Sequence, residues 1–323
     1  MKRIPDKSHP DEYCLILKGG LSMLRNYLFL LGIGSIWGSQ FIFQQMAVTD
    51  LPAVWVGAGR SMVGFLTLFL ICKALGLKGK GGQWFSFSLI GLLEATIPFV
   101  LVAWGQQYLD TAVAAILMGT IPFFTVILAP LVIKGSRITA AGLGSVILGF
   151  CGLVILFYPE LVSDSGNTNL LGAAAIIFAS GCFAVALLLL KGVSTENPLI
   201  IARNILASST VQILVVAMIM SPISEVQPTA SSMMAILYLG TMCAGLVYFL
   251  YMMLIRDAGP VFASLNNYLV PMIGVLLGAT INNEALPINT WAALAVILMA
   301  VAFNQIFQGK GKKAKGKLQP AAA

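Results

Sequence analysis

The sequence predicts an all-α protein that crosses a membrane ten times, and its composition is the first observation behind that prediction. Of its 323 residues, 59% are hydrophobic and only 10% are charged, whereas a soluble domain has about 25% charged residues. The mean hydropathy is +0.92. Apolar stretches of roughly 20 residues, long enough to cross a bilayer core about 30 Å thick as helices, recur along the chain. We therefore expect lipid to solvate much of this apolar surface.

Turn-forming residues separate these stretches, as at Asp50-Leu51-Pro52 and the glycines at 79, 81 and 82. Backbone polar groups cannot stay unpaired in lipid, so each stretch should be helical. The predicted spans are 27–47, 54–74, 85–104, 111–132, 139–158, 170–190, 199–220, 232–255, 261–280 and 288–307. Residues 1–26 and 308–323 then form two tails outside the membrane, the second of them basic.

The distribution of charge supports ten spans. With that count, the 17 Lys and Arg residues other than Arg60 and Arg203 all fall on one side of the membrane, while the charged residues of the opposite loops are Asp and Glu. The positive-inside rule then places both termini in the cytoplasm. We expect a multi-pass protein of a cell membrane, specifically a bacterial inner membrane. The lysines of the C-terminal tail predict contact with anionic lipids, and the absence of aromatic residues among them argues against nucleic-acid binding.

Sequence features recur after roughly 149 residues. Ile121-Pro122-Phe123-Phe124 in the fourth span corresponds to Val270-Pro271-Met272-Ile273 in the ninth, and Arg60 in the second span is echoed by Arg203 in the seventh. Each half holds five spans, an odd number, so the second half is inverted relative to the first. The two halves are residues 27–158 and 170–307. Inverted repeats are typical of secondary transporters, whose substrate site lies near the midplane.

The motifs and their order resemble a known family. The first span reads Ile36-Trp37-Gly38-Ser39-Gln40-Phe41, Arg60 lies in the second span, and the fourth and ninth spans carry a proline before a hydrophobic run. In these features the chain resembles the EamA-type transporters of the drug/metabolite transporter superfamily. Glu284 matches the glutamate of that family's G-E motif, whereas the first half departs from it with Gly135, which argues for a structural role of the glutamate. The resemblance implies export of small organic metabolites, such as amino acids or drugs.

Two ionisable residues lie deep in the predicted membrane, where a charge costs about 2.5–3.5 kcal/mol. Glu94 is ten residues from both Trp84 and Trp104, and Arg60 is eight residues past Pro52, or about 12 Å deep. We expect these two side chains to pair or to share a polar cavity. They form either a structural ion pair or a mechanistic one, in which Glu94 changes its proton or its partner during transport.

Other polar residues are candidates for the substrate path. Trp37, Gln40, Phe41 and Gln44 recur at helical spacing on one face of the first span, which should face the bundle because amides are costly in lipid. This face either bonds neighbouring helices or lines the path, and we favour the path. Pro122 and Pro271 are expected to break their helices, and each frees a backbone carbonyl that a nearby polar side chain or the substrate can satisfy. Further candidates are Thr120, Ser180, Tyr248, Tyr251, Asn266, Asn267 and Tyr268, for each of which packing is the simpler role.

We therefore predict a secondary transporter that works by alternating access on a small-molecule substrate, as a monomer or a homodimer in contact with membrane lipids. No cofactor or metal is expected, and proton coupling, facilitated efflux and counter-exchange stay open. A flippase for lipids or lipid-linked sugars is the alternative on the same fold. A membrane-embedded enzyme is less favoured, because the spans contain no histidine, HExxH or GxSxG motif.

Overall fold

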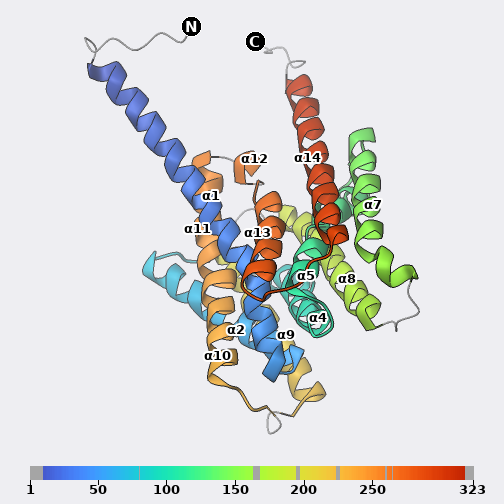
Figure 1. Ribbon diagram of the computed structural model, residues 1–323. Helices are drawn as coiled ribbons and strands as arrows, with labels where there is room; N and C mark the ends of the chain where they lie inside the picture. The colour runs from blue at the N-terminus through green and yellow to red at the C-terminus, as the bar shows by residue number, and fades with distance from the viewer. Residues whose placement is uncertain are drawn as a thin grey trace.

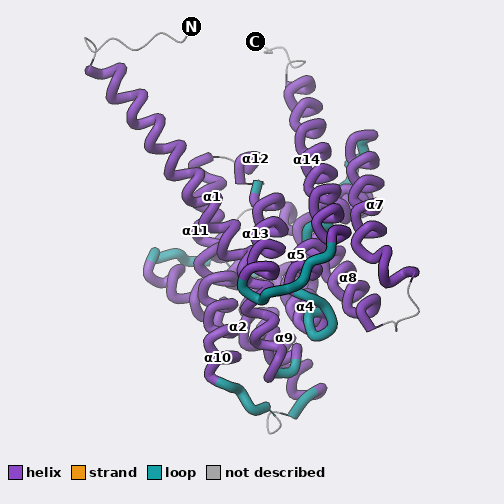
Figure 2. The backbone as a smooth tube through the Cα atoms, viewed as in Figure 1, coloured by secondary structure: helices purple, strands orange, loops and turns teal. Residues whose placement is uncertain are grey.

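The computed structural model describes residues 10–79, 81–162, 168–193, 197–222, 226–258, 260–263 and 265–316, and the regular structure in these ranges is helical (Figure 2). The first half contains a long first helix and two spans that are divided into shorter pieces. Its elements are α1 (Pro10–Asp50), α2 (Ala53–Ala74), α3 (Trp84–Gly91), the π-helical segment η1 (Leu92–Thr96), α4 (Ile97–Gly105), α5 (Thr111–Met118), α6 (Ile121–Val132) and α7 (Ala140–Val162).

The second half follows a similar order. Its elements are α8 (Thr168–Leu189), the short 3₁₀ segment η2 (Leu190–Val193), α9 (Pro198–Met220), α10 (Ala230–Tyr238), the π-helical segment η4 (Leu239–Leu246), α11 (Val247–Ala258), α12 (Pro260–Ala263), α13 (Asn266–Thr280) and α14 (Ile288–Gly316). A π-helical segment therefore lies within the third predicted span and another within the eighth.

The helices are long and apolar enough for a polytopic membrane protein. Six helical segments of the described chain meet both conditions, and they are Ala53–Ala74, Trp84–Gly105, Thr111–Val132, Leu170–Leu189, Pro198–Met220 and Ala230–Ala258. Shorter apolar helices cover Gly142–Tyr158 and Ile288–Phe303. Large apolar side chains such as Phe85 and Leu131 are more than 80% exposed, as lipid-facing residues would be. The count of ten spans stays a prediction.

The predicted tails differ from the structure. Residues 10–26 are helical and continuous with α1, because no proline interrupts the chain between Pro10 and Pro52. At the other terminus, α14 extends past residue 307 to Gly316. The polar gap expected from residue 159 begins only after Val162, where α7 ends, and residues 163–167 lie outside the described ranges.

The two halves are interleaved rather than side by side. Helix α2 packs on α9, α7 on α14 and α5 on α13, and each of these pairs takes one helix from each half (Figure 1). The start of α1 and the end of α14 lie at the same end of the bundle, which we call the inner end, and the opposite end is the outer end. Small residues permit close crossings, as where Gly274 of α13 faces Ala115 of α5.

Candidate functional site

Arg60 of α2 lies at the centre of the bundle and links two glutamines of α1. Its Nη1 donates to Oε1 of Gln44 at 2.9 Å, and its Nη2 donates to Oε1 of Gln40 at 2.6 Å. The guanidinium carbon is 4.2 Å from the ring centroid of Phe99 in α4. Arg60 is 7% exposed and Gln44 is 1% exposed. Neutral acceptors and an aromatic face therefore balance this buried cation.

Glu94 lies on η1 and is 8% exposed. Its Oε1 accepts a hydrogen bond of 2.8 Å from the hydroxyl of Tyr248 in α11. Beside it is a small cavity with room for about one water molecule, lined by Phe99 and Tyr248 among others. Glu94, from the third predicted span, is thus held by the phenol of Tyr248, a neutral donor from the eighth.

Arg60 and Glu94 were expected either to pair or to share a polar cavity, and the first of these alternatives, a direct ion pair, is not formed in this structure. Among the described residues, ion pairs join Asp257 to Arg25 and to Arg256, and neither Arg60 nor Glu94 forms one. The physical reason is that the amides of α1 reach the guanidinium, while the hydroxyl of Tyr248 reaches the carboxylate. Phe99 contacts both environments, since its ring lies against Arg60 and also lines the cavity beside Glu94.

Trp37 of α1 provides an aromatic wall at the same level. Its indole Nε1 donates to the carbonyl of Cys243 in η4 at 3.2 Å. Its ring is 5.2 Å from that of Tyr251 and 6.2 Å from that of Tyr248, centroid to centroid. The structure therefore brings together Trp37, Gln40, Gln44, Arg60, Glu94, Tyr248 and Tyr251, which sequence analysis had taken from four different spans.

Three polar atoms of this cluster are buried without a hydrogen-bond partner in the described protein. They are Nε of Arg60, Nε2 of Gln44 and Oε2 of Glu94. An unsatisfied buried donor or acceptor costs about 1–3 kcal/mol, and more when the group is charged. Such atoms in a native structure need an explanation, and a bound ligand or water is a direct one. We name these residues with their aromatic neighbours the central cluster: Trp37, Gln40, Gln44, Arg60, Glu94, Phe99, Tyr248 and Tyr251.

Thr120 and Ser180 lie at a helix break instead. Helix α5 ends at Met118 and α6 begins at Ile121, just before Pro122. The hydroxyl of Thr120 donates to the carbonyl of Leu117 at 2.6 Å, and the hydroxyl of Ser180 donates to the same carbonyl at 3.3 Å. These side chains satisfy backbone carbonyls at the break, so their described contacts are structural.

The polar residues that begin α13 are divided by its helical geometry. Asn266 is buried and donates to the carbonyl of Ala263 at 3.3 Å, whereas Asn267 is exposed. Tyr268 packs against the apolar core around α5 and α8. The expectation that Pro271 breaks its helix is wrong, because Pro271 lies inside α13, which continues through it to Thr280. None of these described contacts reaches the central cluster.

At the outer end, Glu284 joins the two halves. Its Oε1 and Oε2 accept hydrogen bonds from the backbone N–H groups of Thr111 and Ala112, at 2.9 and 3.0 Å. These N–H groups begin α5 and lack partners within the helix. Asp110 precedes them in the chain; burial raises the pKa of its carboxyl, and the negative charge of Glu284 raises it further.

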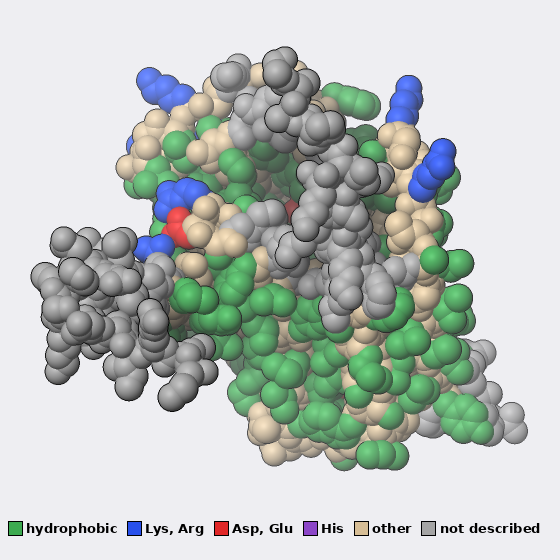
Figure 3. Space-filling model, turned by 90° about the horizontal axis from the view of Figure 1, so that it is seen from above, with side chains coloured by type: hydrophobic (Ala, Val, Ile, Leu, Met, Phe, Trp, Pro, Cys, Tyr) green, Lys and Arg blue, Asp and Glu red, His purple; other side chains and the backbone are tan. Residues whose placement is uncertain are grey.

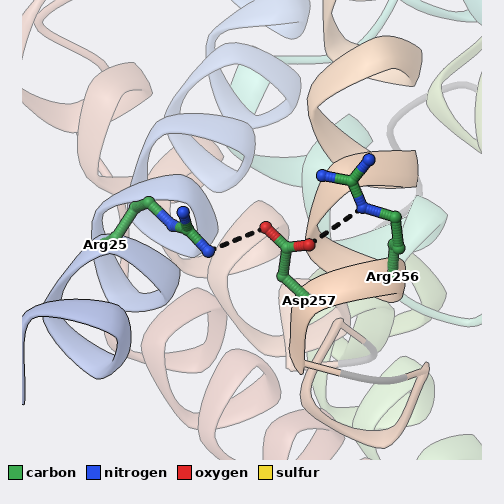
Figure 4. A network of polar contacts seen from close by, with 3 residues as sticks. All are labelled: Arg25, Arg256 and Asp257. Atoms are coloured by element: carbon green, nitrogen blue, oxygen red, sulfur yellow. Dashed lines mark hydrogen bonds and ion pairs between the residues drawn. The ribbon is translucent and has the colours of Figure 1, made fainter. Parts of the chain in front are cut away.

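At the inner end, an ion-pair network connects α1 to α11. Asp257 accepts from Arg25 at 2.9 Å with one carboxylate oxygen and from Arg256 at 2.9 Å with the other (Figure 4). Both arginines are more than half exposed. Exposed pairs of this kind contribute about 0–1 kcal/mol, so the network orients side chains more than it stabilises the fold.

Comparison with known proteins identifies the family. The sequence profile of the EamA-like transporter family matches residues 24–158 and again residues 168–305. The chain belongs to the EamA-like transporter family. Trp37 and Arg60, on which the resemblance partly rested, belong to the central cluster of this EamA-like transporter, and both carboxylate oxygens of Glu284 bond to backbone N–H groups, which fits a structural role.

Several relatives of this EamA-like transporter bear transporter names. It is 26% identical over 272 residues to the uncharacterized inner membrane transporter YedA of Escherichia coli, covering 82% of this chain and 86% of YedA. It is 20% identical to the uncharacterized transporter YoaV of Bacillus subtilis, covering 87% and 97%. A solved crystal structure at 15% identity has a TM-score of 0.64 and covers 86% of this chain and 98% of the other, which shows a shared fold.

Sequence reasoning missed two features of the central cluster. Phe99 carried no signal, because one phenylalanine in an apolar span cannot be distinguished from a core residue. The π-helical segments η1 and η4, which carry Glu94 and Cys243, were also missed. A π-helix changes the hydrogen-bond register of a turn without changing the hydrophobic pattern. Its association with functional sites is visible only once the backbone is known.

Proposed function

We propose that this protein is a secondary transporter that exports small organic metabolites by alternating access. The observation that supports this most is the central cluster, in which buried donors and a buried acceptor lack partners within the described protein. Arg60 and Gln44 offer N–H groups, and Glu94 offers a carboxylate oxygen. Rings of Trp37, Phe99 and Tyr248 lie next to these groups. Ligand sites combine apolar walls with a few polar groups in this way, and the cavity beside Glu94, which has room for about one water molecule, would have to widen to admit a metabolite.

The ligand chemistry follows from the two sides of the cluster. Arg60 and Gln44 would bind a carboxylate or another acceptor, and Glu94 would bind an ammonium or another donor. Amino acids and related compounds carry both groups on one small framework, so we propose them as the substrate class. Glu94 would then change its partner or its proton as the substrate enters and leaves.

The packing of the helices supports two inverted five-span repeats. Helix α1 corresponds to α8 in the second half, and α6 corresponds to α13. The packing of α1 on α13 therefore has its counterpart in the packing of α8 on α6. The same correspondence relates the packing of α4 on α8 to that of α11 on α1, and η1 to η4. A pseudo-two-fold axis of this kind allows the two ends of the bundle to open in turn.

We propose that the inner end faces the cytoplasm of a bacterial cell. Lys and Arg side chains lie around the face that is seen from above in Figure 3, which is the inner end, and the surface there is hollowed. Arg25, Lys73, Lys134 and Arg256 belong to segments at this end. The positive-inside rule places such an end in the cytoplasm, together with both termini.

Extracellular metabolite profiling would test the proposed function. Cells that overproduce the wild-type protein are compared with an empty-vector control and with cells that produce Glu94→Gln at equal membrane levels. We expect a small set of metabolites to accumulate outside with wild type, and about tenfold less with Glu94→Gln, because an amide at this position loses the negative charge that would hold a cationic group. Export that is equal for wild type and Glu94→Gln over pH 6–8 would assign Glu94 a structural role. If wild type equals the empty vector, import or lipid flipping takes precedence over export.

A further inference from the structure

Several polar contacts join the two halves at the outer end, whereas at the inner end the ion pair of Arg25 with Asp257 joins them. Besides Glu284, the indole of Trp55 donates to the carbonyl of Ser221 at 3.1 Å, and the amide of Asn289 donates to the carbonyl of Leu156 at 3.0 Å. The hydroxyl of Thr229 donates to Asp50 at 2.5 Å. These contacts join the halves across the outer end, beside a cavity of about 220 Å³ whose lining includes Asp110, Leu156 and Asn289, while Figure 3 shows a hollow at the inner end.

Glu284 makes the most specific of these contacts. Both of its carboxylate oxygens are used on the first N–H groups of α5, where the partial positive charge of the helix favours an anion. Asn282 adds a 2.8 Å bond from its Nδ2 to the hydroxyl of Thr111. The carboxylate lies against Gly278, where a Cβ would meet Oε2 of Glu284, so a larger residue at this position would displace the carboxylate from its contact. One loop of the second half is therefore fastened to a helix start of the first half.

The inner end cannot form the equivalent contact. A shift of roughly 149 residues replaces Glu284 by Gly135 and Gly278 by Ala129, and residues 129–138 contain no Asp or Glu. On the other side of the contact, Thr111 corresponds to Pro260, which has no backbone N–H, and Ala112 corresponds to Val261, so one of the two donors is lost. The acceptor, the space for it and a donor are thus all missing from the inner counterpart.

We infer that Glu284 is a one-sided clasp that keeps the outer end closed and makes the inward-open form the resting state of this transporter. The inference rests on the proposed alternating access. If the two repeats were identical, the inward-open form would have this contact at the outer end and the outward-open form would have the same contact at the inner end, because the two halves exchange their conformations during alternating access. Here only one of the two forms gains the clasp, and a contact present in one form alone shifts the population toward that form.

Hydrogen–deuterium exchange of the full-length protein in lipid nanodiscs tests the clasp. The variants are Glu284→Gln and Gly278→Ala, which displace the carboxylate by different routes. We expect amides in residues 105–115 and 278–290 to exchange at least about tenfold faster in both variants, a factor that corresponds to about 1.4 kcal/mol. We also expect amides at the inner ends of α6 and α11 to exchange more slowly, because the inner end closes when the outer end opens.

The matched control is Asp110→Asn, which removes one charge from the same corner without breaking the bonds of Glu284. It should leave both sets of amides close to their wild-type exchange rates. Faster exchange confined to the outer end in the Glu284 and Gly278 variants would overturn the inference, since it would mean local fraying. The same pattern in Asp110→Asn would overturn it too, because net charge would then explain the effect. Exchange does not depend on the substrate, so a failure here is distinct from a failure of the export measurement.

Discussion

Arg60 holds two side chains of another helix in place, and this geometry separates it from a simple buried charge. A guanidinium offers a planar fork of donors, whereas a lysine ammonium is a point charge that cannot bond both amide oxygens in the same way. Gln40 and Gln44 depend on this fork for their hydrogen bonds. The arrangement of the central cluster should therefore be sensitive to the shape of the cation as well as to its charge.

We predict that Arg60→Lys lowers the export rate at least about tenfold while the protein still reaches the membrane in near-normal amount. Export rates at equal membrane levels would measure this. The matched control is Arg203→Lys, because Arg203 bonds to Asn204 on its own helix and contacts neither glutamine. An Arg60→Lys variant that exports as fast as Arg203→Lys would show that charge alone is sufficient at this position.

Asp110 gives a prediction that depends on pH. Burial, and then the charge of Glu284, raise the pKa of its carboxyl above the ordinary 3.8. A raised carboxyl pKa means that the folded protein binds the proton more tightly than the unfolded chain does, so stability falls as the pH rises from the ordinary value through the raised one. Asp110→Asn should therefore raise Tm at neutral pH, by about 1 °C because the group is partly exposed.

The gain in Tm should disappear in acid below the ordinary pKa of Asp110, where the wild-type carboxyl is protonated and resembles the amide. Asp110→Glu keeps the charge and should show no gain at any pH. Thermal unfolding in detergent from about pH 3 to pH 8, a range that extends below the ordinary pKa of 3.8, would compare the three proteins. A gain of equal size at every pH would indicate that the amide acts by hydrogen bonding instead.

At the scale of elements, the two π-helical segments bring backbones unusually close together. Gly240 lies in η4 against α2, and a Cβ added there would meet Val63. Gly91 immediately precedes η1, and a Cβ there would be 2.7 Å from the hydroxyl oxygen of Ser209 in α9. Each half therefore presses its third span against the second span of the other half, and the widened turn lies at that crossing.

We predict that Gly240→Ala destabilises the protein by about 1–3 kcal/mol, the usual range for overpacking. It should also slow export, because the displaced η4 carries the carbonyl that Trp37 bonds. Gly32→Ala is the control, since a Cβ there meets nothing within 4 Å and alanine favours the helix. Tm and export rate would be measured for both. Equal Tm values for the two variants would contradict the close crossing.

The element boundaries show what the sequence could and could not predict. Apolar length and the prolines located the spans well: the predicted span 199–220 is nearly the same as α9, Pro198–Met220. The break before Pro122 followed from the missing N–H of proline, but Pro271 leaves α13 helical. The sequence alone does not distinguish the two prolines, and the residues before them determine where each helix begins. Gly119 and Thr120 end α5 just before Pro122, whereas α13 begins at Asn266, five residues before Pro271.

At the scale of the whole molecule, the sequence identified which polar residues would be buried in the bundle but not which groups they would bond to. Polar residues within apolar spans pointed to Gln44, Arg60 and Glu94 because such groups are costly in lipid. Of the two arrangements expected for Arg60 and Glu94, the ion pair suggested by their opposite charges does not form, because the packing of α1 and α11 supplies neutral partners. Which neutral group lies closest depends on helix rotations of a few degrees, and a hydrophobic pattern does not specify those.

The length of α1 has a mechanical consequence. Its 41 residues correspond to about 60 Å of helix, roughly twice the thickness of the hydrocarbon core. Gln40 lies near its outer end, so about 45 Å of rod extends from the level of the central cluster to Pro10. A tilt of about 10° at that level would sweep the far tip through about 8 Å. A fluorophore attached near Pro10 would therefore move several ångströms when α1 tilts slightly at the level of the central cluster. Its displacement in the aqueous phase would report rearrangements around a bound molecule.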